Sequence, residues 1–113
     1  MKVHTELGPG FLEAVYQEAL EREFIKRAIP FTRFPKLTLY FDGDKLNKYY
    51  VADFLCYDCI VLELKASQFL SSSYFDQLQN SLKASKHKLG MLINFGTPSL
   101  FYKRIINNSL NSH

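Results

Sequence analysis

Three ionisable residues, Asp53, Glu63 and Lys65, lie inside two expected strands that are otherwise apolar. A charged group inside a hydrophobic strand is costly unless it has partners, so such positions are candidates for chemistry. Glu63 and Lys65 are two residues apart, which puts both side chains on one face of a strand. Two carboxylates beside a lysine suit metal-assisted hydrolysis of phosphodiesters, because carboxylates bind Mg²⁺ or Mn²⁺ and an ammonium stabilises developing negative charge.

The alternative is that Glu63 and Lys65 form a solvated pair on the surface, since Glu-x-Lys sequences are common on exposed strands. Apolar neighbours on both strands argue against it. They are Val51, Phe54 and Leu55 around Asp53, and Val61, Leu62 and Leu64 around Glu63 and Lys65.

The register of the hairpin that joins the two strands decides whether the carboxylates meet. A strict two-residue turn at Tyr57 and Asp58 pairs Cys56 with Cys59 and sends the carboxylates of Asp53 and Glu63 to opposite faces. A shared site therefore requires a three-residue loop or a bulge between the strands.

The spacing of Asp53 and Glu63-Leu64-Lys65 resembles the core motif of the PD-(D/E)xK nuclease superfamily. The segment from Gly10 to Tyr16 resembles the signature of one branch, the GxxExxY proteins. Further segments resemble that branch in the same order along nearly the whole chain: 4–10, 76–83 with Gln77, and 89–96. One position departs from the pattern, because Ser81 stands where the branch usually has Tyr.

This resemblance implies a metal-dependent nuclease that hydrolyses phosphodiester bonds of DNA or RNA. We expect Asp53 and Glu63 to bind Mg²⁺ or Mn²⁺, with the backbone carbonyl of Leu64 as a further ligand. Lys65 is expected to position or deprotonate the attacking water and to offset charge on the phosphorane.

Two further residues have two interpretations each. Glu13 either interacts with the dipole of its helix or completes the acidic shell of the metal, as the resemblance implies. Gln77 either is a solvated helix residue or hydrogen-bonds the attacking water or a phosphate oxygen.

A basic stretch follows the second long helix. Lys83, Lys86, His87 and Lys88 are candidates for contacts with a phosphate backbone, and the alternative is a solvated basic loop. The net charge of +3 is compatible with nucleic-acid binding but does not establish it.

Composition bounds the remaining possibilities. A chain of 113 residues with 47% hydrophobic and 22% charged residues suits one globular domain over 1–113. The sequence shows neither a signal peptide pattern nor an apolar run near the ~20 residues of a membrane helix, so we expect a cytoplasmic protein without membrane contacts. Cys56 and Cys59 form one Cys-x-x-Cys, which we interpret as flanking a turn, with metal or redox chemistry as the alternative.

Periodicity and turn residues predict a mixed α/β fold of four or five strands flanked by helices, in the order α-β-β-β-α-β with a possible last strand. With the resemblance, this order implies a restriction-endonuclease-like core. The expected helices are 11–26 and one after Ser71, with Ser73 and Asp76 as a capping box. The expected strands are 31–41, 48–56, 59–66, 90–95 and 101–106, followed by a frayed polar tail over 107–113.

Two other classes of function compete with the nuclease. One is a nucleic-acid-binding module of the same fold without turnover, which Ser81 and the small size favour slightly. The other is an interaction protein that forms a homodimer, since 15% aromatic residues exceeds the need of a small core.

Overall fold

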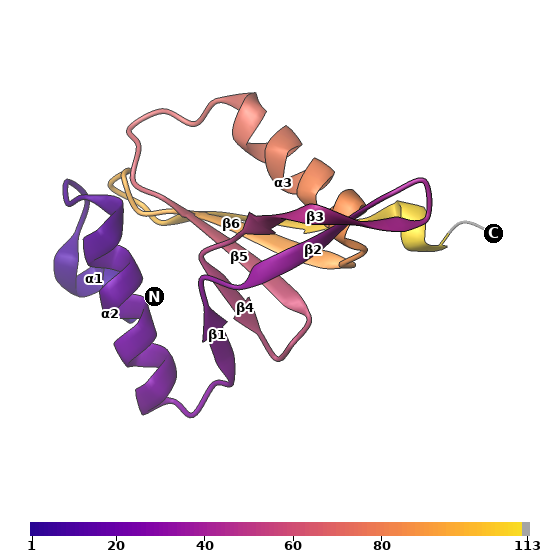
Figure 1. Ribbon diagram of the computed structural model, residues 1–113. Coiled ribbons are helices and arrows are strands. Elements are labelled where there is room, and N and C mark those ends of the chain that lie inside the picture. The colour runs from indigo at the N-terminus through magenta and orange to yellow at the C-terminus, as the bar shows by residue number, and fades with distance from the viewer. Residues whose placement is uncertain (112–113) are drawn as a thin grey trace.

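The computed structural model describes residues 1–111, in which helices lie on both faces of a mixed sheet (Figure 1). The helices are α1 (Lys2–Leu7), α2 (Glu13–Lys26), α3 (Ser72–Ser85) and the 3₁₀ helix η1 (Asn108–Asn111). The strands are β1 (Phe31–Arg33), β2 (Lys36–Phe41), β3 (Asp44–Val51), β4 (Phe54–Cys56), β5 (Ile60–Lys65), β6 (Leu89–Asn94) and β7 (Phe101–Ile106).

The main sheet has five strands in the order β1-β4-β5-β6-β7. β5 and β6 are parallel and every other neighbouring pair is antiparallel. A parallel pair needs a crossover connection, and α3 supplies it between β5 and β6. The predicted mixed α/β class and the helical crossover to a further strand are therefore confirmed.

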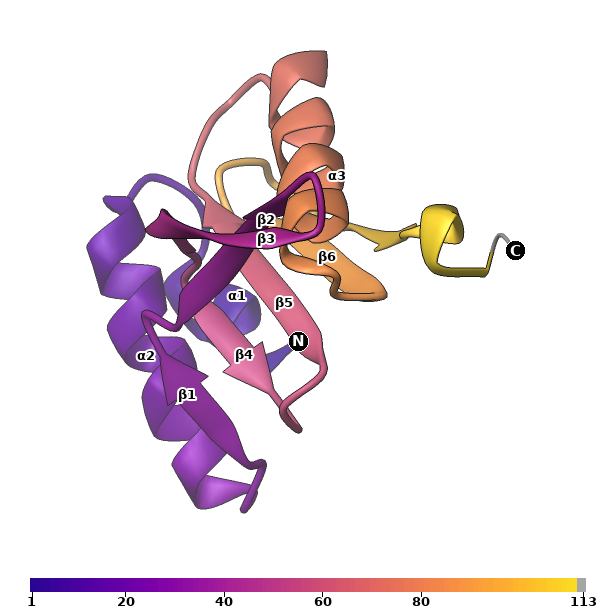
Figure 2. The same cartoon turned by 45° about the vertical axis from the view of Figure 1, so that its right-hand side comes forward.

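Two hydrophobic clusters cover the two faces of this sheet. Because side chains alternate along β5, Leu62 and Leu64 face α1 and α2, whereas Val61 faces α3. The first cluster is centred on Tyr16, Phe54 and Phe95, and the second on Leu78, Leu82 and Leu92. Figure 2 shows α1 and α2 on one side of the sheet and α3 on the other.

A second sheet is formed by β2 and β3 alone, and it corrects the prediction that 31–41 and 48–56 are continuous strands. The antiparallel register continues from Arg33 opposite Phe54 to Lys36 opposite Val51, but both chains bend between these pairs. Phe34 has a positive φ of 51°, and its N–H bonds the carbonyl of Asp53 at 2.9 Å. Pro35 follows and fixes the bend, because it has no N–H for a strand ladder.

The N-terminal end of α2 is set by Tyr16 rather than by a capping side chain. Leu12 is extended, so the helix begins at Glu13 and not at Phe11 as predicted. The buried hydroxyl of Tyr16 donates to the carbonyl of Gly8 at 2.5 Å and accepts from the N–H of Phe11 at 3.2 Å. The ring stacks on Phe95, with 4.6 Å between centroids. Tyr16 thus holds the loop that delivers Glu13.

Two other predictions near helix ends are wrong in detail. The cap of α3 is Ser71, whose hydroxyl accepts from the N–H of Ser73, so Ser73 is not the capping residue. Asn107 is fully buried and not part of a frayed tail. Its amide donates to the carbonyls of Leu82 and His87, which ties the segment after β7 to the end of α3. Residues 112 and 113 lie outside the described residues.

No helix within residues 1–111 is both long and apolar enough to cross a membrane.

Candidate active site

The loop between β4 and β5 has the length that a shared site requires. Cys56 pairs with Ile60 and Phe54 with Leu62, which leaves three residues, 57–59, in the loop. Continuing this register by one residue sets Asp53 opposite Glu63. The three-residue loop that a shared site requires is therefore present. The two carboxylates meet beside β5, just before β4 begins at Phe54.

Asp53 is held by two donors from other elements. Its Oδ2 accepts a hydrogen bond from the backbone N–H of Leu64 at 2.6 Å, and its Oδ1 accepts from Nε2 of Gln17 on α2 at 2.8 Å. Burial raises the pKa of Asp53, and the bond from Leu64 opposes this shift because it stabilises the ionised form. The carboxylate takes the place of a strand partner at the open edge of β5.

Glu63 lies on the face of the sheet that carries α3 and contacts Tyr50. The Tyr50 hydroxyl donates to Oε1 of Glu63 at 3.0 Å, and the bend of the hairpin brings Tyr50 there. Burial, followed by the negative charge of Asp53, raises the pKa of Glu63 to about 8. Burial also raises the pKa of Tyr50, and the hydroxyl of the buried Ser81 on α3 opposes this shift.

Glu13 and Lys65 complete the charged cluster. Burial raises the pKa of Glu13. The positive charge of Lys65 opposes this shift and the negative charge of Asp53 adds to it, so both charges act on Glu13. The ammonium of Lys65 lies over the ring of Tyr74 on α3, with 4.4 Å between Nζ and the centroid. Lys65 and Glu63 share a face of β5, as their spacing predicts.

The segment after Lys65 is clamped by the end of β6. The buried side chain of Asn94 accepts from the N–H of Ser67 at 3.0 Å and donates to its carbonyl at 2.8 Å. Gly96 passes so close that a Cβ there would lie 2.4 Å from the backbone nitrogen and oxygen of Ser67. This contact fixes the direction in which the chain leaves Lys65.

Gln77 is exposed on α3 and lines a cavity together with Tyr50 and Ser81. It therefore lies on the same side of the sheet as Glu63, and Tyr50 is shared by the cavity and the carboxylates.

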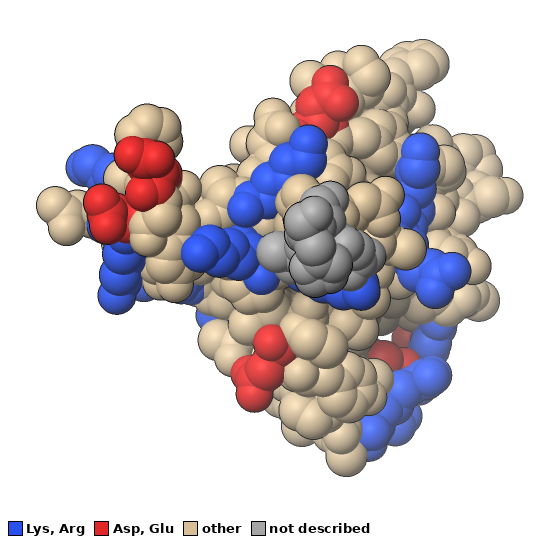
Figure 3. Space-filling model, turned by 90° about the vertical axis from the view of Figure 1, so that its right-hand side faces the viewer, with Lys and Arg blue, Asp and Glu red and all other residues tan. Residues whose placement is uncertain are grey.

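The predicted basic residues lie at the other end of α3. Lys83 lies six residues after Gln77, about 9 Å along a helix, and Lys86 lies nine residues after Gln77, about 14 Å along it. Lys86 caps α3, and Lys88 follows before β6. The structure thus does not bring Lys83, Lys86 and Lys88 next to the carboxylates. On the face shown in Figure 3, Lys and Arg side chains form several separate groups with acidic side chains between them.

Three residues of the site were missed at the level of sequence. They are Gln17, Tyr50 and Asn94. The side chain of each forms a hydrogen bond with a residue more than ten positions away in the chain. Gln17 had a usable signal, because it lies one helical turn after Glu13 and therefore on the same side of α2. Tyr50 and Asn94 had none, since both contacts depend on how distant strands meet.

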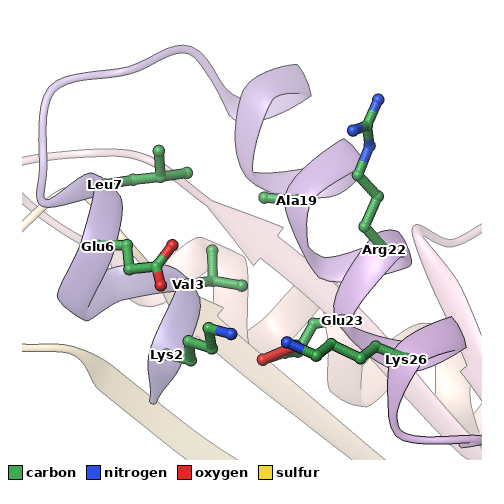
Figure 4. A pocket seen from close by; sticks show the side chains of 8 residues that line it. All are labelled: Lys2, Val3, Glu6, Leu7, Ala19, Arg22, Glu23 and Lys26. Atoms are coloured by element: carbon green, nitrogen blue, oxygen red, sulfur yellow. The ribbon is translucent and has the colours of Figure 1, made fainter.

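A groove between α1 and α2 is a separate feature (Figure 4). It has a volume of about 240 Å³ and is lined by charged side chains that include Lys2, Glu23 and Lys26. Glu23 follows Glu13 by ten residues, about 15 Å along α2, so the groove is remote from the carboxylates.

The donor set at β5 fits a hard divalent cation. Asp53 and Glu63 offer carboxylate oxygens, and the carbonyl of Leu64 points to the same strand edge as its N–H, which bonds Asp53. Burial and, after it, the negative charge of Asp53 raise the pKa of Glu63, and a bound cation would offset both effects. Within residues 1–111, however, no three His, Cys, Asp or Glu side chains are gathered closely enough to hold an ion by themselves. Any metal shell would need Leu64 and water.

Comparison with known proteins identifies the class. The profile of the PD-(D/E)XK nuclease superfamily matches residues 1–105, so the chain belongs to this superfamily and has its restriction-endonuclease-like fold. Nucleases of the superfamily generally use Mg²⁺ or Mn²⁺. No curated protein matches the chain.

Among solved structures, the crystal structure of SSO0001 is similar, with a TM-score of 0.64 and 21% sequence identity. The match covers 82% of this chain and 48% of that one, so the chain spans about half the length of the related structure. At this identity the likeness concerns the fold.

Proposed function

We propose that this chain, taken as one unit over 1–113, is a metal-dependent nuclease that hydrolyses phosphodiester bonds of DNA or RNA. The observation that carries the proposal is the three-residue loop before β5, which brings Asp53 opposite Glu63 while Lys65 shares the face of Glu63. The segment from Gly10 to Tyr16 supports assignment to the GxxExxY branch, because Tyr16 and Gly8 hold the loop that delivers Glu13.

In this proposal Asp53, Glu63 and the carbonyl of Leu64 would hold the cation, and Glu13 would complete the shell through water. A bound Mg²⁺ or Mn²⁺ supplies Lewis acidity to a phosphoryl oxygen and lowers the pKa of water. The chain itself provides the orientation. Gln17 and the N–H of Leu64 fix both oxygens of Asp53, and Tyr50 fixes one oxygen of Glu63.

Lys65 acts on the substrate rather than on the cation, because an ammonium has no lone pair to donate. Its contact with Tyr74 keeps the ammonium on the α3 side of β5, where Glu63 also points. From there it positions the attacking water and offsets charge on the phosphorane. Gln77 lines the neighbouring cavity and is proposed to hydrogen-bond the water or a phosphate oxygen.

A manganese titration of wild type and Glu63→Ala tests the proposal, with metal affinity and cleavage of mixed single- and double-stranded DNA and RNA measured together. We expect Glu63→Ala to lose both. Glu18→Ala is the matched control, since Glu18 is an exposed glutamate of α2 paired with Arg22 at 3.1 Å. Manganese affinity and cleavage that survive in Glu63→Ala contradict the proposal.

A second candidate is a nucleic-acid-binding module without turnover. It is favoured by the hydrogen bonds that occupy Asp53 and Glu63, because three of their oxygens already accept from Gln17, Leu64 and Tyr50. Binding of nucleic acid by a wild type that cleaves none of the four substrates in manganese supports this candidate instead.

A further inference from the structure

A groove lies between the β2–β3 hairpin and α3, beside the candidate active site. Its cavity has a volume of about 470 Å³, within the ordinary range for small-ligand sites. The α3 residues that line it recur at spacings of three and four, so they form one stripe of the helix. Its walls include Leu39, Tyr50, Gln77, Asn80, Ser81 and Ala84.

The lining is uncharged, although charged groups surround it. Leu39 and Ala84 give apolar surface, and the exposed amides of Gln77 and Asn80 are one turn apart on α3. Neither amide has a hydrogen-bond partner within residues 1–111, so both are available to a ligand. An apolar wall with free amides suits a nucleobase, because Asn and Gln amides match the donor and acceptor pattern of base edges. The lining holds no cationic side chain that could pair with a phosphate.

An ammonium group lies near each end of the α3 stripe, whose first and last lining residues are Ser73 and Ala84. Lys65 is held over the ring of Tyr74 at one end, with 4.4 Å from Nζ to the centroid. Lys86 is held over the ring of Tyr40 at the other, also at 4.4 Å. Tyr74 and Lys86 are twelve residues apart, about 18 Å along a helix. This length exceeds the spacing of successive phosphates in a strand.

We propose that this groove binds an unpaired nucleobase of a single-stranded nucleic acid, with Lys65 and Lys86 contacting phosphates on either side of it. The inference rests on the proposed function for the placement of one phosphate at Lys65. A single strand is required because the groove contacts the edge and faces of the base, which pairing and stacking cover in a duplex. Asn80, Leu39 and Ala84 thereby gain a role in substrate selection.

Binding without cleavage tests this directly. Fluorescence anisotropy in EDTA compares a labelled deoxyadenosine decamer with a labelled decamer in which every residue is abasic. We expect the wild type to bind the complete strand about tenfold more tightly, because only the complete strand offers a base to the groove. Equal affinity for the two strands overturns the inference, as does the absence of binding to either.

Variants locate the effect in the groove. Ala84→Trp fills the cavity and should lower affinity for the complete strand to that of the abasic strand, leaving the abasic strand unchanged. Lys86→Ala should weaken both strands by the same factor. Gln79→Trp is the matched control, because Gln79 lines the other flank of α3 beside Lys103. A preference for the complete strand that persists in Ala84→Trp overturns the inference.

A measurement on the wild type avoids any question of misfolding. In ¹⁵N NMR, deoxyadenosine monophosphate should shift the side-chain amide signals of Gln77 and Asn80, whereas ribose 5-phosphate should not. Equal shifts from both compounds, or none from either, contradict base binding. Cleavage activity is scored separately: base-dependent binding without cleavage refutes only the nuclease, and cleavage with base-independent binding refutes only the groove.

Discussion

The carboxylate of Asp53 accepts a hydrogen bond from the backbone N–H of Leu64, with 2.6 Å between Oδ2 and the nitrogen. Leu64 stands between Glu63 and Lys65, so this one bond ties the acid of one strand to the centre of the motif on the next. It forms because β4 begins only at Phe54, which leaves the N–H of Leu64 without a strand partner. The edge that opens there carries the proposed metal ligands.

Manganese should stabilise the folded protein through these ligands. An ion that binds only the folded state stabilises it by mass action, about 2.7 kcal/mol at one hundred times its Kd. We expect millimolar Mn²⁺ to raise the melting temperature of wild type and not of Asp53→Ala, measured by scanning calorimetry. Equal shifts in the two proteins would show that the ion binds elsewhere.

Stability without metal should fall as pH rises. The folded pKa of Glu63, about 8, lies above the ordinary value of 4.5, so the folded state binds a proton that the unfolded state releases between these values. This contribution is fully present below pH 4.5 and is lost as pH rises through about 8. Urea unfolding in EDTA at pH 5 and pH 8.5 measures it.

Glu63→Gln is the control for that pH dependence, because it keeps the shape of the side chain and removes the titrating group. We expect the loss of stability between the two pH values to be smaller in this variant, by an amount on the order of a few kcal/mol. An unchanged loss would assign the effect to other groups.

The strands and helices that build the site could largely be predicted from sequence, because the alternation in β5 and the stripe of α3 are local patterns. The convergence of Asp53 and Glu63 could be stated only as a condition on loop length. A turn of two or three residues fits the same Tyr57, Asp58 and Cys59, and the choice depends on packing across the whole sheet.

What could not be predicted depends on distant contacts. The bend of the hairpin needs a positive φ at Phe34, a backbone conformation that is unfavourable for a residue with a bulky side chain. The hydrogen bond from the N–H of Phe34 to the carbonyl of Asp53 offsets this cost. Tyr50 reaches Glu63 only because of this bend. From sequence, Asn107 looks like part of a polar tail. In the fold its side-chain amide donates to the carbonyls of Leu82 and His87, which lie far from it in the chain.

Gly96 should tolerate no side chain. A Cβ there would meet the backbone of Ser67 at 2.4 Å, and backbone cannot move aside as a flexible side chain can. We expect Gly96→Ala to lower the free energy of unfolding by about 1–3 kcal/mol, as overpacking does, measured by urea denaturation. Ser99→Ala, at an exposed position in the same connection, should change the free energy of unfolding little. A neutral Gly96→Ala would contradict the close packing of Gly96 against Ser67.

The hydroxyl of Tyr16 should contribute to stability as well as to the placement of Glu13. Tyr16→Phe leaves the carbonyl of Gly8 and the N–H of Phe11 without their partner, at a cost of about 1–2 kcal/mol. Thermal denaturation measures this cost. Tyr57→Phe, at a residue 55% exposed, is the matched control and should stay within about 0.5 kcal/mol of wild type. Equal values for the two variants would contradict the anchoring role.

Cleavage by Lys65→Met measures what the ammonium contributes to hydrolysis, because methionine keeps much of the packing of the stem and removes the charge. In manganese, with DNA and RNA substrates, we predict a rate about 10²–10³ lower than that of wild type, together with unchanged or slightly tighter manganese binding. Lys26→Met, in the remote groove of Figure 4, should cleave at the wild-type rate. If Lys65→Met cleaves as fast as wild type, Lys65 has no part in the hydrolysis and the proposed active site is wrong.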